Sequence, residues 1–400
     1  MQVVVVGAGQ AGAAVAARLR AQGHAGGVTL IGAEAAPPYQ RPPLSKGYLL
    51  GEMPADRLWL RGAEFYADQG IDLRLGAAVT AIDPAARVVT VGGGPVGYDH
   101  LVLATGAVPR RLPAAIGGDL GGVHTVRSLA DVDAMRAEFA PGRRLVIVGG
   151  GYIGLEAAAV AVRLGLQVTV LEMAQRILQR VASPQTSSYF KQLHQSHGVT
   201  ILESTGLERV LGAGRVRAVR LSDGREVPAD FVIVGVGVTP DTALAQAAGL
   251  QIDNGIWTDE MGRTSDPAIW AAGDCASFPQ GEGRLRIESV GNAIDMAEAV
   301  ADNILGAMTP YTARPWFWSD QYDCKLQIAG LNTGYDRVVV RGPVGDAVSH
   351  WYFRGLDLLA VDAMNDPRAY MVGKRLIEAS RSVDPAALID PATDLKSLLR

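Results

Sequence analysis

The chain has 400 residues, enough for two or three domains, and its 48 glycines and 48% hydrophobic content are typical of α/β proteins with buried parallel strands. A formal net charge of −4 gives no sign of binding to nucleic acid or to an anionic membrane. The two cysteines, Cys275 and Cys324, lie far apart and outside any Cys-x-x-Cys. This argues against a disulfide framework, a thiolate metal site and an electron relay through a redox-active disulfide.

The N-terminus begins directly in a predicted strand, without a charged leader or a small-residue cleavage site. No apolar run approaches the roughly 18 residues of a transmembrane helix. We therefore expect a soluble, cytoplasmic protein.

The first 31 residues predict a strand, a glycine turn, an alanine-rich helix and a second strand. The strand Val3–Val6 leads into the motif Gly7-x-Gly9-x-x-Gly12, and the second strand covers 28–31. In such a motif the first glycine permits the turn, the second admits a pyrophosphate to the backbone, and the third allows close packing of helix and strand. The helix N-terminus then offers N–H groups to the phosphates. After the second strand, Glu34 is the candidate ligand of an adenosine ribose.

A proline-rich segment, residues 37–46, follows this unit and predicts a rigid, extended loop. It carries Arg41 and Lys46, which could neutralise a flavin phosphate or lie beside an isoalloxazine ring. The alternative is a solvated proline linker.

A second unit repeats the first. The strand 145–148 leads into Gly149-x-Gly151-x-x-Gly154, and the next strand ends in Glu172. The two units form an internal repeat of a nucleotide-binding unit.

The acidic residue of the second unit favours NADH over NADPH. A carboxylate at Glu172 would accept hydrogen bonds from both ribose hydroxyls and would repel a 2′-phosphate. Arg176 and Arg180 come later and could in principle soften this preference.

Three further apolar strands, in 98–106, 231–237 and 269–274, end in small residues. Asp274, at the end of the third, could accept a hydrogen bond from a ribityl hydroxyl. A helix begins within 286–293, and its N–H groups could stabilise negative charge on the N1–C2=O edge of a reduced flavin. After Pro310, strands at 337–341 and 348–353 and a helix near 373–380 predict a separate α+β domain.

Several segments occur together and in order: 39–46, 104–106, 149–156, 273–276, 286–290 and 316–322. On these segments the chain resembles, over essentially its full length, the oxygenase-coupled NADH–ferredoxin reductases of the FAD-dependent pyridine nucleotide-disulfide oxidoreductase superfamily. The combination of the proline-rich Ser-Lys loop with the Trp-Ser-Asp-Gln segment is specific. Two positions depart from relatives: Ala33, where many carry an acid, and Gly291, where Pro or Gln is common.

The resemblance implies an α/β fold with two Rossmann-like domains of the glutathione reductase type and an α+β C-terminal domain. The expected boundaries are 1–108 with 240–310 for a split FAD domain, 109–239 for the NADH domain, and 311–400 for the C-terminal domain.

The expected cofactors are FAD and NADH, with no metal. Motifs and resemblance together predict an FAD site of Gly7, Gly9, Ala11, Gly12, Glu34, Arg41, Lys46, Val79, Ala104, Thr105, Gly106, Arg127, Asp274, Ser289, Val290 and Trp316. The predicted NADH site consists of Gly149, Gly151, Tyr152, Ile153, Gly154, Glu156, Glu172, Arg180, Val236 and Gly237.

The resemblance also implies the catalytic roles. Lys46 would lie near the flavin N5 and stabilise charge on the reduced ring, and Glu156 would modulate Lys46. The alternative for this pair is an ordinary interdomain salt bridge. Hydride transfer itself requires no general acid or base, because the cofactors carry the chemistry.

The partner implied by the resemblance is a [2Fe–2S] ferredoxin, which accepts one electron at a time. It would serve a cytochrome P450 or a Rieske oxygenase. It would dock near the flavin edge, where residues 316–321 are expected, and the chain would be a monomer or weak dimer. Basic docking candidates are Arg57, Arg61, Arg284, Arg286, Arg314 and Lys325.

Other readings remain open at this point. A rubredoxin reductase or an NADH oxidase would keep the fold and change the acceptor. An NADH peroxidase needs a redox cysteine beside the flavin, and neither cysteine has that setting. A redox-sensing protein like apoptosis-inducing factor would carry a targeting leader and long C-terminal insertions, which this sequence does not show.

Overall fold

The computed structural model describes residues 1–62, 64–390 and 392–399. The chain divides into two compact units, each assembled from separate segments. The first consists of Met1–Gln40, Ala55–Val108 and Val238–Pro315, and the second of Arg41–Pro54, Pro109–Gly237 and Trp316–Arg400. The predicted division into three domains stays a prediction.

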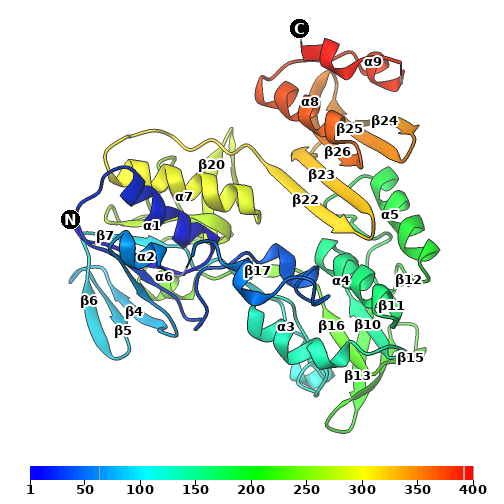
Figure 1. The fold of residues 1–400 in the computed structure, drawn as a ribbon, viewed down its shortest axis with the longest axis horizontal. Coiled ribbons are helices and arrows are strands. Elements are labelled where there is room, and N and C mark those ends of the chain that lie inside the picture. The colour runs from blue at the N-terminus through cyan, green and yellow to red at the C-terminus, as the bar shows by residue number, and fades with distance from the viewer. Residues whose placement is uncertain (63, 391, 400) are drawn as a thin grey trace. The chain divides into compact units, whose positions relative to one another are not determined.

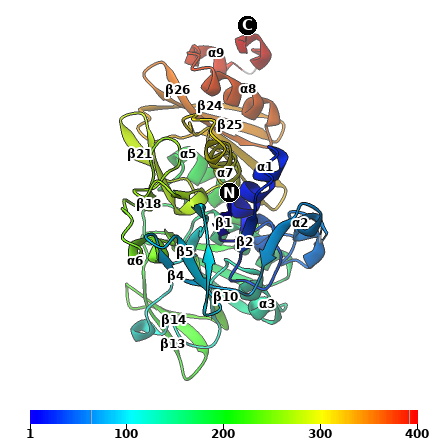
Figure 2. The same ribbon diagram turned by 90° about the vertical axis from the view of Figure 1, so that its left-hand side faces the viewer.

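The first unit is built on a parallel five-stranded sheet in the order β19–β7–β1–β2–β3. Its strands are β1 (Val3–Val6), β2 (Val28–Ile31), β3 (Ile71–Arg74), β7 (His100–Leu103) and β19 (Ile269–Ala271). All four valines of β1 are buried, as expected for a central parallel strand covered on both faces. Helices α1 (Gln10–Ala21) and α7 (Val290–Ile304) run side by side, and Arg18 of α1 holds Asp302 of α7 through two hydrogen bonds of 2.7–2.8 Å (Figures 1 and 2).

Smaller elements complete this unit. They are the antiparallel sheet of β4 (Val79–Asp83), β5 (Val88–Val91) and β6 (Gly94–Gly97), the sheet of β18 (Ile256–Trp257), β20 (Ala276–Gln280) and β21 (Gly283–Leu285), and the short helices η2 (Ala55–Leu58), α2 (Phe65–Asp68), α6 (Ala243–Ala247) and η5 (Gly273–Cys275). Strands β8 (Ala107–Pro109) and β17 (Val238–Pro240) pair where the chain leaves and re-enters this unit.

The second unit contains a sheet of the same design, in the order β9–β16–β10–β11–β12. Its strands, parallel throughout, are β9 (Val123–His124), β10 (Arg144–Val148), β11 (Gln167–Leu171), β12 (Thr200–Leu202) and β16 (Phe231–Val234). Strand β10 occupies the central position that β1 has in the first sheet. On one side β11 and β12 correspond to β2 and β3, and on the other side β16 and β9 correspond to β7 and β19. The predicted internal repeat is therefore confirmed.

The other elements around this second sheet are η3 (Ala114–Ile116), α3 (Leu129–Met135), η4 (Arg136–Glu138), α4 (Tyr152–Arg163), α5 (Pro184–Ser196), and the antiparallel sheet of β13 (Leu207–Gly212), β14 (Val216–Leu221) and β15 (Glu226–Pro228). Helix η1 (Pro42–Ser45) also belongs to the second unit.

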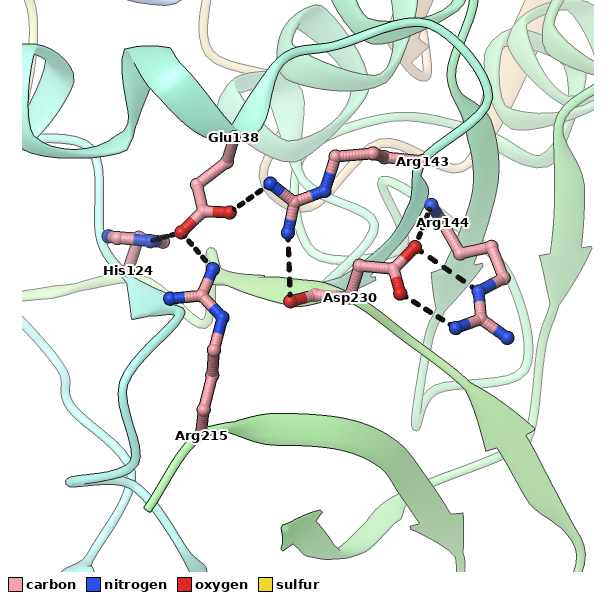
Figure 3. Close-up of polar contacts among 6 residues, drawn as sticks. All are labelled: His124, Glu138, Arg143, Arg144, Arg215 and Asp230. Atoms are coloured by element: carbon pink, nitrogen blue, oxygen red, sulfur yellow. Dashed lines mark hydrogen bonds and ion pairs between the residues drawn. The ribbon is translucent and has the colours of Figure 1, made fainter. Parts of the chain in front are cut away.

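A charged cluster ties the loops at the amino ends of β10 and β16 (Figure 3). Glu138 forms an ion pair with Arg143 at 2.6 Å and accepts a hydrogen bond from Arg215, and Asp230 pairs with Arg144 at 2.6 Å. Burial opposes ionisation of Glu138, but the hydrogen bond from Arg215 and the two positive charges outweigh it and lower the pKa of Glu138. The hydrogen bond from Arg144 is the main cause that lowers the pKa of Asp230 to about 2. This cluster fastens the sheet at the end opposite to its glycine turn.

The C-terminal part of the second unit is an antiparallel sheet in the order β22–β23–β26–β25–β24 with helix α8 packed on it (Figure 1). Its elements are β22 (Trp316–Gln321), β23 (Cys324–Gly330), β24 (Arg337–Val344), β25 (Ala347–Arg354), β26 (Asp357–Met364), α8 (Pro367–Glu378), α9 (Pro385–Ile389) and η6 (Leu395–Leu399). The predicted strands are confirmed. The helix begins earlier than predicted, because Asp366 caps it by accepting from the Ala369 N–H at 2.9 Å and Pro367 fits its first position.

No helix within residues 1–62, 64–390 and 392–399 is long and apolar enough to cross a membrane.

Candidate active site

The first glycine turn has the shape that a bound pyrophosphate requires. A Cβ on Gly7 would lie 2.1 Å from the Ala104 carbonyl oxygen, and one on Gly12 would lie 1.9 Å from the Gly7 carbonyl oxygen. Gly7 also has φ +110°, which side chains rarely adopt. A Cβ on Gly9 would instead point into open space. The first and third glycines therefore serve packing, and the second leaves room for a phosphate.

Two candidate FAD ligands lie beside this turn in the first unit. Gly273 packs so closely on Ala11 that a Cβ there would come within 2.9 Å of the Ala11 Cβ, which puts Asp274 next to the start of α1. Ser289 caps α7 by accepting from the Asn292 N–H at 3.1 Å, so the helix begins at Val290, within the predicted segment 286–293.

Glu34 follows β2 and is held by a neighbouring tyrosine. A Cβ on Gly32 would lie 2.7 Å from the Ala8 Cβ, so the end of β2 is adjacent to the glycine turn. Tyr39 donates its hydroxyl to Glu34 Oε2 at 2.6 Å. The carboxylate thus has a fixed orientation at the edge where the adenosine ribose is expected.

The remaining candidates of the first unit are scattered around the same core. Val79, at the start of β4, is partly buried and packs on the hydrophobic core. Ala104, Thr105 and Gly106 follow β7, and the Thr105 hydroxyl donates to the Asp241 carbonyl at 2.6 Å. Of these residues, Ala104 borders the first glycine turn through its carbonyl oxygen.

The second glycine turn repeats the geometry of the first. Gly149 has φ +108°, and a Cβ there would lie 2.4 Å from the Gly235 carbonyl oxygen. A Cβ on Gly154 would lie 2.4 Å from the Gly149 carbonyl oxygen, whereas one on Gly151 would meet nothing within 4 Å. This turn, at the carboxyl end of β10 and the start of α4, also leaves room for a pyrophosphate.

Glu172, directly after β11, is oriented by two backbone N–H groups. Its Oε2 accepts from Gly150 at 2.9 Å and its Oε1 from Ala174 at 2.8 Å. Arg176 points away, because its guanidinium donates to the Ala182 carbonyl at 2.8 Å and to Ser187 Oγ at 2.6 Å. Arg180 is exposed. The carboxylate is thus fixed for ribose hydroxyls, and Arg176 is engaged elsewhere.

Exposed apolar side chains occur at this same edge. Ile153 and Val236, both predicted, are 46% and 41% exposed, and Met173, which follows Glu172, is 82% exposed. Large exposed apolar side chains grouped beside a phosphate cradle suit the flat faces of a dinucleotide. Sequence reasoning missed Met173, although its place directly after the ribose carboxylate was the available signal.

The predicted catalytic pair forms within the second unit. Lys46 Nζ lies 2.7 Å from Glu156 Oε2, and the two side chains are 18% and 5% exposed. Residues 42–45 form a 3-10 turn and are not extended as predicted, because the φ of Pro42 suits the first helical position. This turn directs Ser45, whose hydroxyl donates to Glu156 Oε2 at 2.6 Å.

The edge strand β22 contributes a third partner to Glu156. The Ser319 hydroxyl donates to Glu156 Oε1 at 2.7 Å. Because side chains alternate along a strand, Phe317, Ser319 and Gln321 share one face, and Phe317 lies 5.1 Å from the Tyr152 ring. Sequence reasoning selected this segment but assigned no role to Ser319 or Gln321.

The other predicted FAD residues belong to the second unit. Arg41 donates to the Arg127 carbonyl oxygen at 2.6 Å, so these two candidates meet. Trp316 stacks on Trp318 with ring centroids 5.4 Å apart, on the face of β22 opposite to Ser319. Lys374 of α8 lies 5.8 Å from the Trp316 ring centroid.

Comparison with known proteins agrees with this geometry. The model of the pyridine nucleotide-disulphide oxidoreductase family matches residues 1–297, and a reductase C-terminal model matches residues 316–399. The chain belongs to this family. It is 45% identical over 404 residues to a ferredoxin–NAD(P)+ reductase of Sphingomonas sp., covering 99% of this chain and 97% of that protein.

Two further relatives are of the same kind. The ferredoxin–NAD(+) reductase component of the anthranilate 1,2-dioxygenase system of Burkholderia cepacia is 42% identical over 402 residues, covering 99% of this chain and 98% of that protein. The crystal structure of a covalent putidaredoxin reductase–putidaredoxin complex matches with a TM-score of 0.96 at 42% identity, covering 100% of this chain and 98% of that one.

The two cysteines of the sequence both lie in the described part of the chain and form no disulfide with each other. Cys275 and Cys324 are both free and buried. Burial is the main cause that raises the pKa of each thiol, to about 11 for Cys324. Neither thiol is therefore a ready nucleophile near neutral pH.

The basic docking candidates separate into two groups. Arg57, Arg61, Arg314 and Lys325 are exposed. Arg284 donates to the Thr258 carbonyl at 2.7 Å, and Arg286 pairs with Glu288 at 2.7 Å, with side chains only 22% and 11% exposed. The last two arginines are partly buried and have partners within the chain, and the docking role of all six residues stays a prediction.

Proposed function

We propose that this protein is an FAD-dependent NADH:ferredoxin oxidoreductase that passes electrons singly to a [2Fe–2S] ferredoxin of a cytochrome P450 or Rieske oxygenase system. The repeated glycine turn carries the proposal, since each copy leaves the space of a missing Cβ open at the second glycine. FAD, when bound, supplies the chemistry that accepts a hydride from a nicotinamide and releases the electrons one at a time.

The assignment of the two turns rests on what surrounds them. The first has Glu34 and Asp274 beside it and is proposed to bind FAD. The second has Glu172, held by Gly150 and Ala174, and is proposed to bind NADH. Arg176 donates to Ala182 and Ser187 and so does not point to the nucleotide site. The 2′-phosphate of NADPH would therefore lie near the Glu172 carboxylate without this arginine to neutralise it, which favours NADH over NADPH.

The Lys46–Glu156 pair is proposed to act beside the reacting atoms. A partly buried ammonium next to a reduced flavin would stabilise its negative charge, and the buried Glu156 would hold the ammonium in place. The low exposure of the two side chains, 18% and 5%, supports this role, because the effect of a charge is larger where water is excluded.

The ferredoxin partner is supported by the names of the relatives and by the matching complex with putidaredoxin. A cytoplasmic location is part of the proposal, and the two free, buried thiols suit a reducing compartment.

The test is cytochrome c reduction by the purified holoprotein with NADH, with and without an added [2Fe–2S] ferredoxin. Strong acceleration by the ferredoxin supports the proposal. Fast oxygen consumption without it would indicate an NADH oxidase, and acceleration by rubredoxin alone a rubredoxin reductase. A long-lived complex of reduced flavin and NAD+ that does not respond to ferredoxin would indicate a redox sensor.

A further inference from the structure

The carboxylate of Glu156 is buried and receives donors from two separate parts of the chain. Ser45 and Lys46 both approach Oε2, at 2.6 and 2.7 Å, and Ser319 donates to Oε1 at 2.7 Å. Ser319 is itself fully buried on β22. The ion pair with Lys46 is therefore not isolated, because the C-terminal sheet holds the other oxygen of the carboxylate.

A line of hydrogen bonds continues beyond Ser319. Gln321 Nε2 donates to Ser319 Oγ at 3.0 Å, and Gln321 Oε1 lies 2.8 Å from His194 Nε2 on α5. The other ring nitrogen of His194, Nδ1, lies 3.1 Å from the Tyr322 hydroxyl. Gln321 and His194 are fully buried, so each of these polar groups depends on its neighbours for partners.

Only one arrangement of protons satisfies this line. An ionised carboxylate can only accept, so the Ser319 hydroxyl must donate to Glu156 and accept from the Gln321 amide. The Gln321 oxygen must then accept from His194 Nε2–H, which leaves His194 Nδ1 to accept from Tyr322. Burial lowers the pKa of His194 to about 4, so its ring is neutral, as this arrangement requires. Every hydrogen bond thus points toward Glu156.

We propose that Ser319 and Gln321 are positioning residues that hold Glu156 through this directed line of hydrogen bonds and so determine how much of the Lys46 charge is available to the flavin. The inference deepens the proposed function and rests on the role given there to Lys46. With the Ser319 donor removed, only Ser45 and Lys46 stabilise the charge of Glu156, so Lys46 compensates more of that charge. Less positive charge then remains to stabilise the reduced cofactor.

The first test is the redox equilibrium of the bound flavin against a dye of known potential in the Ser319→Ala holoprotein. We expect a shift of about tenfold toward oxidised flavin, about 30 mV for a two-electron couple. The matched control is Ser349→Ala, which removes another fully buried serine of the same sheet whose partners are Asp366 and Trp351. An unchanged equilibrium in Ser319→Ala, or the same shift in Ser349→Ala, overturns the proposal.

The second variant reverses the line without changing its shape. In Gln321→Glu the new carboxylate cannot donate to Ser319, so the serine hydroxyl turns toward it and away from Glu156. This variant should therefore reproduce the shift of Ser319→Ala. If the Gln321→Glu variant has the same redox equilibrium as the wild-type protein, the direction of the hydrogen bonds has no effect on the flavin and the proposal is wrong.

A third measurement does not depend on any variant folding. Nitrogen NMR of histidine-labelled wild-type protein should show His194 neutral, with its proton on Nε2, at pH 7. A proton on Nδ1 of His194 would contradict the proposed direction of the hydrogen bonds. The ferredoxin assay separates this inference from the proposed function. If the wild-type protein does not reduce ferredoxin but Ser319→Ala shifts the redox equilibrium of the flavin, the proposed acceptor is wrong and the positioning role stands. If the wild-type protein reduces ferredoxin but neither variant shifts the redox equilibrium of the flavin, only the positioning role is wrong.

Discussion

The Ser319 hydroxyl donates a 2.7 Å hydrogen bond to Glu156 Oε1, although the two residues lie 163 positions apart in the chain. Ser45 reaches the same carboxylate from 111 positions away on the other side. Glu156 therefore connects the proline-rich turn, the helix of the second glycine motif and the C-terminal sheet. A change in any of these three elements should therefore alter the ion pair between Glu156 and Lys46.

Removing the charge of Glu156 tests whether the pair acts in the reaction or only in folding. Glu156→Gln keeps the size of the side chain but leaves the mostly buried Lys46 without its counter-ion. We expect the rate of flavin reduction by NADH, followed by stopped flow, to fall at least tenfold, or about 1.4 kcal/mol in the barrier. The control is Glu52→Gln, which breaks an exposed pair with Arg163. A lower melting temperature with an unchanged rate would make Lys46–Glu156 an ordinary salt bridge.

The two kinds of glycine in the second turn should respond differently to alanine. A methyl group at Gly151 meets nothing within 4 Å, so Gly151→Ala should melt like wild type but raise the KM for NADH about tenfold or more. A methyl group at Gly154 would lie 2.4 Å from the Gly149 carbonyl oxygen, so Gly154→Ala should lower the melting temperature by several degrees. Calorimetry and steady-state kinetics measure both effects. Equal losses of stability would show that the second glycine is also needed for packing.

The choice of nicotinamide nucleotide should depend on Glu172 and not on Arg176. Glu172→Gln removes the charge that disfavours a 2′-phosphate, and we expect the ratio of kcat/KM for NADPH to that for NADH to rise at least tenfold, about 1.4 kcal/mol. Arg176→Ala should leave the ratio unchanged, because that guanidinium is occupied by Ala182 and Ser187. A ratio that falls in Arg176→Ala would mean that Arg176 reaches the nucleotide.

Acidification should destabilise the protein through its buried histidines. Burial lowers the pKa of His194 and of His350 to about 4 from 6.5. The folded state then binds fewer protons than the unfolded state between these values, so stability present above pH 6.5 is lost as the pH falls toward 4. At pH 5 the loss is about 2 kcal/mol for each histidine.

A third buried group acts in the opposite direction. Burial raises the pKa of Asp362 from 3.8 to about 6. Its contribution to the stability of the folded state is therefore fully present below pH 3.8 and is lost as the pH rises through 6. The two histidines outweigh it, and the melting temperature should be lower at pH 5 than at pH 7.5. His194→Gln should reduce this difference, and Gln195→Ala, at an exposed position without a titratable group on the same stretch, should not. If the melting temperature changes equally between pH 7.5 and pH 5 in wild type and in both variants, His194 does not contribute to the acid destabilisation.

Charge reversal at Arg61 tests the docking of ferredoxin. The side chain is exposed, with its guanidinium 5.2 Å from the Phe65 ring centroid. We expect Arg61→Glu to raise the KM for ferredoxin several-fold, more at low salt, and to leave NADH-to-ferricyanide turnover unchanged. If both rates fall together, Arg61 has no specific part in docking.

The nucleotide units could be predicted from sequence because their requirements are local. Gly7, Gly12, Gly149 and Gly154 occupy positions where a Cβ would collide with backbone a few residues away or with the neighbouring strand, and each pattern of strand, turn and helix repeats within about 30 residues. The acid of the second unit, Glu172, follows from the same spacing. Two of the five antiparallel strands near the C-terminus, β24 and β25, were also predicted from the sequence.

The environment of the reactive pair was decided only by tertiary structure. Sequence alone assigned no role to Ser319 or Gln321 and gave no sign that His194 would complete their line of hydrogen bonds. It also gave no sign of the internal partners of Arg176, Arg284 and Arg286, which only the structure shows. The reason is physical: a glycine turn is specified by sterics within one supersecondary unit, whereas a buried hydrogen bond depends on which side chains the packing of distant segments brings within 3 Å. The geometry of the two glycine turns is thus determined by the local sequence, whereas the side chains that hold Glu156 are brought together by the tertiary structure.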